Sequence, residues 1–254
     1  MANTFLLEIG TEELPADFVR SALQQLERRV RTDLKELRLD HGQLSVTGTP
    51  RRLLVQISDL IDSQPDLEED RKGPPVSQAL VDGQSGPAAI GFAKRCGVDP
   101  SQLQTRDTPK GPCLFARVCT PGRESSVLLQ DFIPQWIDSL QGRRFMRWGS
   151  GEQRFSRPVR WLVALLGEAL IPVTLDASDP LVRSGRHSRG HRLYDELAEL
   201  KSADELPKRL AAAGVMVDRD QRAETIRSSI AAKAASCGGA VSYTHLTLPT
   251  KRIV

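Results

Sequence analysis

A regular spacing of apolar residues between positions 19 and 37 restricts the fold more than any other feature. These residues recur every three or four positions, as the buried face of an α-helix requires. They are Val19, Ala22, Leu23, Leu26, Val30, Leu34 and Leu37. Strand-like apolar runs at 5–9, 44–46 and 53–57 flank the helix, and Gly48 and Pro50 join the last two. We therefore predict a β-α-β-β opening of an α/β fold.

Residues 62–87 combine prolines, glycines and an acidic run with few apolar residues. Such a composition does not bury enough surface for a stable element, so we predict a loop or exposed excursion. The alternation of helix and strand then resumes with a helix at 88–96, a strand at 113–118 and a helix at 125–140.

Two further apolar runs, at 160–166 and 170–175, are separated by Gly167 and Glu168. This spacing predicts a hairpin, with Pro172 at a sheet edge because proline cannot donate a backbone hydrogen bond.

Two residues with cap-forming side chains mark helices near the end of the chain. Ser202 is expected to begin a helix that reaches about residue 213, and Asp218 one that reaches about residue 236. Between these helices, residues 215–217 are predicted to form a brief strand.

These patterns divide the chain into four regions. Residues 1–61 form the β-α-β-β unit, 62–142 the loop excursion with its α/β continuation, and 143–241 an arginine-rich α/β body. The Thr-rich residues 242–254 differ in composition from everything before them, and we interpret them as a non-native tail.

Positive charge is concentrated in one fifth of the chain. Residues 143–192 hold ten arginines and no lysine against four acids, whereas the whole chain has a net charge of only +3. Arginine's planar guanidinium suits bidentate phosphate contacts and stacking on bases. The asymmetry therefore points to a polyanionic partner.

Several classes of function lack their sequence signatures. No uncharged apolar run is long enough to span a membrane, and the acidic N-terminal residues do not resemble a secretory signal, so we expect a cytoplasmic protein. The four cysteines are dispersed and are expected to be reduced. No Gly-rich phosphate loop and no G-x-S-x-G elbow occurs, so we predict no catalytic residue.

His187 and His191 stand four apart, a spacing that could suit a metal ion, but Gly190 and nearby arginines disfavour one. Two interpretations of these histidines remain: they lie in a loop without a ligand, or they contact RNA.

Arginines interleave with aromatic residues at 143–161, an arrangement that fixes phosphates and stacks on unpaired bases. The alternative is that Phe155 and Trp161 belong to the core and the arginines only surround it. The residues expected to face RNA or a partner subunit are Arg147, Arg157, Arg160, Arg186, Arg189, His191 and Arg192.

Six motifs in order resemble the β subunit of bacterial glycyl-tRNA synthetase. They are FLLEIGTEELPA at 5–16, GTPRRLLVQISDL at 48–60, KGPP at 72–75 with PAAIGFAKRCGV at 87–98, RRFMRWG at 143–149, FSRPVRWLVALLGEALIPV at 155–173 and SGRHSRGHR at 184–192. Positions characteristic of that family are Glu8, Thr11, Glu12, Glu13, Pro15, Pro50, Arg51, Arg52, Met146, Arg147, Trp148, Arg157, Pro158, Arg160, Trp161, Gly190, His191 and Arg192. Among these we expect the prolines and Gly190 to shape the backbone, the tryptophans to pack, and the arginines with His191 to face a partner.

The resemblance implies a role in attaching glycine to tRNA(Gly). In that family two α and two β subunits form a heterotetramer; the α subunit holds the site for ATP, Mg²⁺ and glycine, and the longer β subunit positions tRNA. This chain would then be a non-catalytic, tRNA-binding N-terminal part of β that binds no cofactor. Its body region would resemble the B3/B4 domain of phenylalanyl-tRNA synthetase β.

Two other functions stay open at this point. The arginine-rich segment would dock the α subunit if the RNA contacts were made elsewhere. An editing-type hydrolase on a B3/B4-like fold is the third reading, for which the sequence offers neither nucleophile nor metal ligands.

Overall fold

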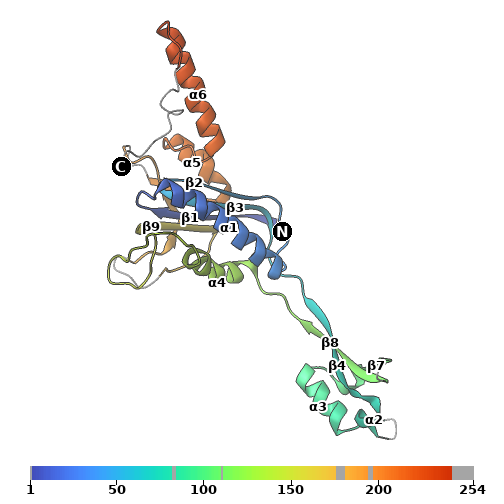
Figure 1. Cartoon of the computed structure of the whole chain (residues 1–254). Helices are drawn as coiled ribbons and strands as arrows, with labels where there is room; N and C mark the ends of the chain where they lie inside the picture. The colour runs from blue at the N-terminus through green and yellow to red at the C-terminus, as the bar shows by residue number, and fades with distance from the viewer. Residues whose placement is uncertain (1, 82–83, 110, 176–180, 194–196, 242–254) are drawn as a thin grey trace, which may run out of the picture.

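The computed structural model describes residues 2–81, 84–109, 111–175, 181–193 and 197–241. Helices and antiparallel sheets are mixed, which confirms the α/β prediction. A main sheet with its helices forms the body, a small unit sits at the end of a two-stranded arm, and one long helix projects from the other end (Figure 1). The tail at 242–254 lies outside the described residues.

The main sheet has strand β1 at its centre. β1 pairs antiparallel with β3 on one side and with β9 on the other, and β2 lies beyond β3. Both β10 and β11 pair with the outer edge of β9. The bounds are β1 Ala2–Thr11, β2 Leu44–Thr49, β3 Arg52–Ile61, β9 Val159–Leu166, β10 Ala169–Leu170 and β11 Ser184–Gly185. Segments 1–61 and 143–241 therefore contribute to one sheet.

The strand predictions in this sheet are largely confirmed. Residues 44–46 and 53–57 fall within the paired strands β2 and β3, and β9 with β10 forms the expected hairpin. The second strand of that hairpin is only two residues long, and Pro172 follows it outside the ladder.

Two helices cover one face of the main sheet, α1 (Ala16–Glu36) and α4 (Ser125–Asp138). The predicted helical periodicity is confirmed, because Ala22, Leu26, Val30 and Leu34 are fully buried against alternate residues of β1. The large apolar core between the helices and the sheet fixes the orientation of both helices.

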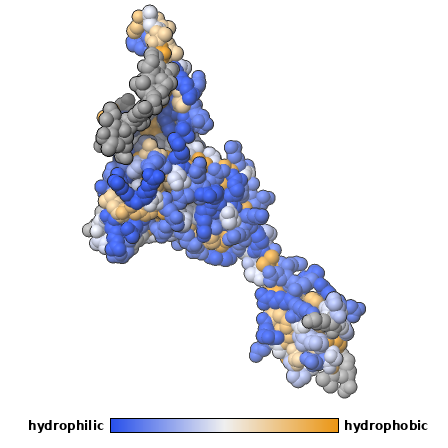
Figure 2. All heavy atoms as spheres, viewed as in Figure 1, coloured by the Kyte–Doolittle hydropathy of each residue, from blue (hydrophilic) through white to orange (hydrophobic). Residues whose placement is uncertain are grey.

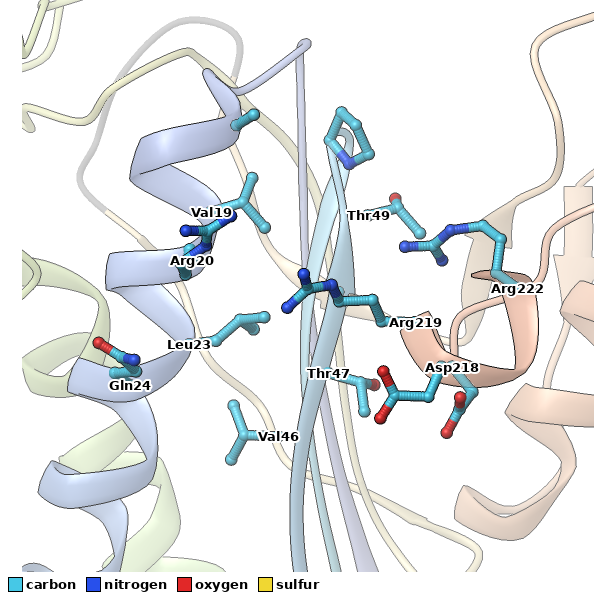
Figure 3. A pocket seen from close by; sticks show the side chains of 14 residues that line it. Val19, Arg20, Leu23, Gln24, Val46, Thr47, Thr49, Asp218, Arg219 and Arg222 are labelled. Atoms are coloured by element: carbon cyan, nitrogen blue, oxygen red, sulfur yellow. The ribbon is translucent and has the colours of Figure 1, made fainter. Parts of the chain in front are cut away.

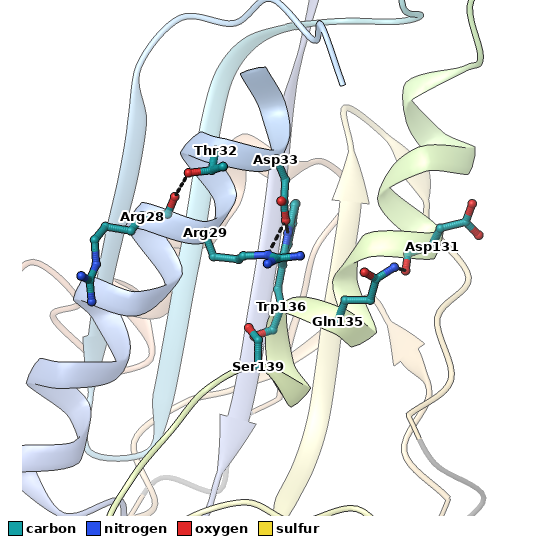
Figure 4. A network of polar contacts seen from close by, with 8 residues as sticks. All are labelled: Arg28, Arg29, Thr32, Asp33, Asp131, Gln135, Trp136 and Ser139. Atoms are coloured by element: carbon teal, nitrogen blue, oxygen red, sulfur yellow. Dashed lines mark hydrogen bonds and ion pairs between the residues drawn. The ribbon is translucent and has the colours of Figure 1, made fainter. Parts of the chain in front are cut away.

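A buried polar contact joins α1 to α4 inside this core (Figure 4). The indole nitrogen Nε1 of Trp136 donates to Oδ2 of Asp33 at 2.7 Å, and Nε of Arg29 donates to the same oxygen at 2.8 Å. Asp33 is therefore satisfied by one fully buried donor and one half-exposed donor.

Trp136→Phe removes the buried donor and should lower the free energy of unfolding by about 1–3 kcal/mol, since the Asp33 carboxylate loses a hydrogen bond away from water. Arg29→Met is the matched control, because its exposed end limits the loss to below about 1 kcal/mol. Urea unfolding followed by circular dichroism measures both. Equal effects of the two substitutions would contradict the proposed importance of the buried bond.

The opposite face of the sheet carries a second, smaller core. It is covered by the hairpin of β12 (His187–Arg189) and β13 (Leu197–Glu199), the short turn η2 (Ala203–Glu205) and helix α5 (Leu206–Ala212). Leu6, Leu54, Val163 and Leu206 are buried in it. Because strand residues alternate between faces, Glu8, Arg52 and Trp161 lie on this side as well.

The chain after α5 corrects one prediction and confirms another. The strand predicted at 215–217 is wrong: these residues form no ladder, and Val215 and Val217 instead pack against the second core. Helix α6 (Arg219–Ser236) begins as expected, since the Asp218 carboxylate accepts from the backbone N–H of Gln221 at 2.6 Å.

The small unit corrects part of the prediction of a loop or exposed excursion at 62–87, because this largely exposed segment contains a paired strand. Strand β4 (Leu67–Pro75) pairs antiparallel with β8 (Cys113–Thr120), so the main-chain ladder stabilises a segment that buries little apolar surface. β7 (Gln104–Arg106) extends the sheet, and α3 (Pro87–Cys96) packs on it, as predicted for 88–96 and 113–118. The remaining elements are α2 Val76–Ala79, β5 Leu80–Val81, β6 Gln84–Ser85 and η1 Pro100–Gln102.

Hydrophilic residues cover most of the face of the main body seen in Figure 2. No helix among the described residues is long and apolar enough to cross a membrane.

Candidate nucleic-acid interface

Three motifs that are distant in sequence meet at one end of the main sheet. The backbone N–H of Thr11 donates to the carbonyl of Arg51 at 2.9 Å, and that of Leu14 donates to Pro50 at 2.6 Å. The N–H of Glu12 donates to Pro158 at 3.1 Å, beside the start of β9. These bonds fix the segment after β1 against the β2–β3 turn and the approach to β9.

A buried ion pair lies beneath this end of the sheet. Nη1 of Arg52 is 3.0 Å from Oε1 of Glu8, and both side chains are almost fully buried. The hydroxyl of Ser188, on β12, donates to the same oxygen at 2.9 Å. Nη2 of Arg52 also donates to the carbonyl of Arg189 at 2.6 Å. The pair therefore ties β1 and β3 to β12.

Burial opposes the charge on both members of this pair. Desolvation raises the pKa of Glu8 above its ordinary 4.5, although Arg52 and Ser188 favour the ionised carboxylate. Desolvation likewise lowers the pKa of Arg52, which Glu8 partly offsets. The expectation that Arg52 faces a partner is wrong, because this side chain is enclosed between the sheet and β12.

Trp161 forms an aromatic platform next to the ion pair. The guanidinium carbon of Arg52 lies 5.6 Å from the centre of its ring, and that of Arg189 lies 5.1 Å away. Trp161 is opposite Gly10 in the β1–β9 register, and its ring fills the space that a side chain at Gly10 would need. The expectation that Trp161 packs is confirmed.

Exposed arginines lie at the same end of the main sheet as Trp161. Nε of Arg160 is 2.7 Å from Oε1 of Glu12, and Nη1 of Arg192 is 2.5 Å from Oε1 of Glu13. Arg189 projects from β12 and is also exposed. Four of the predicted residues thus lie around one end of the sheet: Arg160, Arg189, His191 and Arg192.

The other predicted residues lie in different surroundings. Arg147 pairs with Glu152 at 2.9 Å within the segment before β9. Arg157 lines a cavity of about 290 Å³ together with Arg143 and Arg144. Arg186 donates to the backbone carbonyls of Glu168, Leu200 and Lys201.

A cavity of about 390 Å³ opens beside the β2–β3 turn. Arg51, His191, Arg192 and Arg222 line it, together with Glu13. A second cavity, of about 470 Å³, lies between α1, β2 and the first turn of α6, and shares Thr49, Pro50 and Arg222 with the first. Figure 3 shows Arg222 of α6 pointing toward Thr49 at the end of β2.

Arg51 was expected to face a partner only as a position characteristic of the family and was not among the predicted site residues, and Arg222 was not predicted at all. Both are far from the arginine-rich segment 143–192 on which the charge count concentrated. The signal for Arg51 was its adjacency to a turn proline. Arg222 carried none, because the packing of α6 beside the end of β2 is a tertiary contact that no local pattern shows.

Among the described residues, no group of three or more His, Cys, Asp or Glu is arranged to hold a metal ion. The four cysteines, all within the described ranges, are unpaired. The geometry supports binding of an anionic partner at an arginine-lined surface.

This structure is that of an α/β protein with a basic surface at one end of a mixed sheet. The family model for the glycyl-tRNA synthetase beta subunit matches residues 5–249. The glycine–tRNA ligase beta subunit of Synechocystis is 44% identical to this chain in an alignment that covers 99% of the chain. That of Acaryochloris marina is 45% identical in an alignment that covers 93% of the chain. One from Desulfitobacterium hafniense is 39% identical over 95% of the chain.

The chain belongs to the glycyl-tRNA synthetase β-subunit family. It covers 35%, 33% and 34% of those three relatives, and so spans about a third of their length.

Proposed function

We propose that this chain is a non-catalytic, tRNA-binding part of a glycine–tRNA ligase β subunit. It supports the ATP-dependent attachment of glycine to tRNA(Gly) by an enzyme of two α and two β subunits. ATP, Mg²⁺ and glycine bind at the α subunit, and this chain holds no cofactor. Family membership supports the reaction, and the presence of several exposed arginines at one end of the main sheet supports the contact with RNA.

The arrangement suits a polynucleotide backbone for two reasons. Arg160, Arg189 and Arg192 come from different segments but surround one end of the sheet, so they can meet successive phosphates. The buried Glu8–Arg52 pair beneath them orients β12, which carries Arg189. Contacts of this kind release counterions and make binding strongly salt-dependent.

Replacing Arg160, Arg189 and Arg192 together by glutamine tests the proposal. Between about 50 and 200 mM salt, we expect the slope of log affinity against log salt for tRNA(Gly) to fall by about two to three, and affinity to drop by at least roughly tenfold. Fluorescence anisotropy with labelled tRNA measures both quantities.

The matched control replaces Arg28, Arg31 and Arg123, which are exposed and lie on or before the helices α1 and α4. This variant should bind tRNA like the unmodified chain at moderate salt. Equal losses in both triple variants would indicate nonspecific charge attraction, and a flat salt dependence of the unmodified chain would refute RNA binding.

A second function is favoured by one observation. Glu12 and Glu13 already pair with Arg160 and Arg192, which reduces the charge available to phosphates and presents alternating charges suited to a protein surface. In this alternative the same residues dock the α subunit. Co-purification with the α subunit that is lost in the Arg160, Arg189 and Arg192 variant, with tRNA affinity unchanged, would favour docking.

A further inference from the structure

The cavity of about 390 Å³ beside the β2–β3 turn joins two residues of the predicted site, His191 and Arg192, to segments that the predicted site did not include. Arg51 reaches it from the turn, Arg192 from the segment after β12, and Arg222 from the first turn of α6. Pro50, Val215 and Met216 add apolar wall. The cavity is large enough for a small ligand of mixed polarity.

The cations of this cavity are incompletely neutralised. Arg192 pairs with Glu13, and the neighbouring Arg52 pairs with Glu8. Among the ion pairs within the described ranges, none involves Arg51 or Arg222. The cavity therefore keeps an excess of two positive charges, with His191 on the same wall.

One contact positions Arg222, and the charge of Arg51 acts on its neighbour Arg52. Nη1 of Arg222 donates to the carbonyl of Met216 at 2.6 Å, which fixes the guanidinium against the cavity wall. Arg51 is close enough to Arg52 for its charge to lower the pKa of that side chain, although the loss of water around Arg52 contributes more. An anion bound between Arg51 and Arg222 would relieve this repulsion.

We propose that this cavity binds one nucleotide of an RNA strand, with the phosphate between Arg51 and Arg222 and the base or ribose against Val215 and Met216. This assignment rests on the proposed function and adds a specific subsite to it. Guanidinium groups on two sides of a phosphate supply charge-assisted hydrogen bonds, and the apolar wall shelters the uncharged part of the nucleotide.

The test measures binding of tRNA(Gly) to the full chain carrying Arg51→Gln and Arg222→Gln. The salt slope should fall by about one to two and affinity by roughly tenfold, whereas Arg28→Gln with Arg31→Gln should change neither. Arg51→Lys keeps a charge and should preserve most of the slope. If the double variant unfolds, the single variant Arg51→Gln decides, because within the described residues the Arg51 side chain makes no hydrogen bond or ion pair that the substitution would break.

The outcomes separate this inference from the proposed function. An unchanged salt slope in the double variant, with a reduced slope in the Arg160, Arg189 and Arg192 variant, overturns the subsite and leaves tRNA binding intact. No binding of tRNA by the unmodified chain overturns both. Titration with adenosine monophosphate tests whether the cavity binds a free nucleotide instead of RNA. The RNA assignment is overturned if this nucleotide binds saturably and loses its binding in the double variant, while the double variant binds tRNA as the unmodified chain does.

Discussion

Replacing Arg52 by methionine should lower the free energy of unfolding by about 3–5 kcal/mol, because it leaves the Glu8 carboxylate buried without its counter-charge. Ser188 would then be the remaining donor to Oε1. Loss of Arg52 also raises the pKa of Glu8 further, so the folded variant binds a proton more tightly than the unfolded chain. The variant should therefore lose stability as pH rises above the ordinary glutamate value of 4.5.

Two comparisons make this result specific. Glu8→Met combined with Arg52→Met should recover most of the stability, since Glu8 Oε2 and Arg52 Nε already lack hydrogen bonds within the described structure. Arg160→Met breaks an exposed pair at the same end of the sheet and should cost below about 1 kcal/mol. Urea unfolding at several pH values measures all three variants. An Arg52→Met variant no less stable than Arg160→Met would show that the buried charge is not retained.

Gly10→Ala should be strongly disruptive for so small a change. A Cβ atom at this position would lie 1.9 Å from Cδ2 and Cε2 of Trp161, so the indole has to leave its place. Trp161 is buried, and its ring contacts both Arg52 and Arg189. Overpacking of this kind costs about 1–3 kcal/mol or more, and we expect a matching decrease in melting temperature with altered tryptophan fluorescence.

A second glycine in the chain provides the control. Gly91 lies within α3, and a Cβ atom there would meet nothing within 4 Å. Gly91→Ala should therefore stabilise the chain by about 0.5–1 kcal/mol through helix propensity. Adding Trp161→Leu to Gly10→Ala should restore part of the lost stability. A Gly10→Ala protein with the same melting temperature as the unmodified chain would mean that Trp161 can move without loss of stability.

Local patterns predicted the elements, but not how they assemble. The periodicity of α1 and the Asp218 cap of α6 depend only on neighbouring residues, and both are confirmed. The order of strands around β1 depends on pairing with β9, which no local pattern encodes. Strand β4 was missed because its stability comes from the ladder with β8 rather than from apolar side chains.

The candidate site shows the same limit. Arg160 and Arg192 were found by counting charges, whereas counting could not reveal that Arg186 binds three backbone carbonyls. Glu8 did carry a signal, because it follows Leu6 at a spacing of two in an otherwise apolar strand and must share its face. Its partner Arg52 is in phase with Leu54 in the same way.

The central position of β1 affects how the chain folds during synthesis. β1 can pair with β3 as soon as residues 1–61 have left the ribosome. The other edge of β1 stays unpaired until β9 has been synthesised, because in the folded chain that edge pairs with β9, with Phe5 opposite Leu166. Until then an apolar strand edge stays open, and such edges pair readily with other chains. A nascent chain that stalls before residue 159 therefore exposes the unpaired edge of β1, which is prone to aggregation. Early binding of a chaperone would protect this edge.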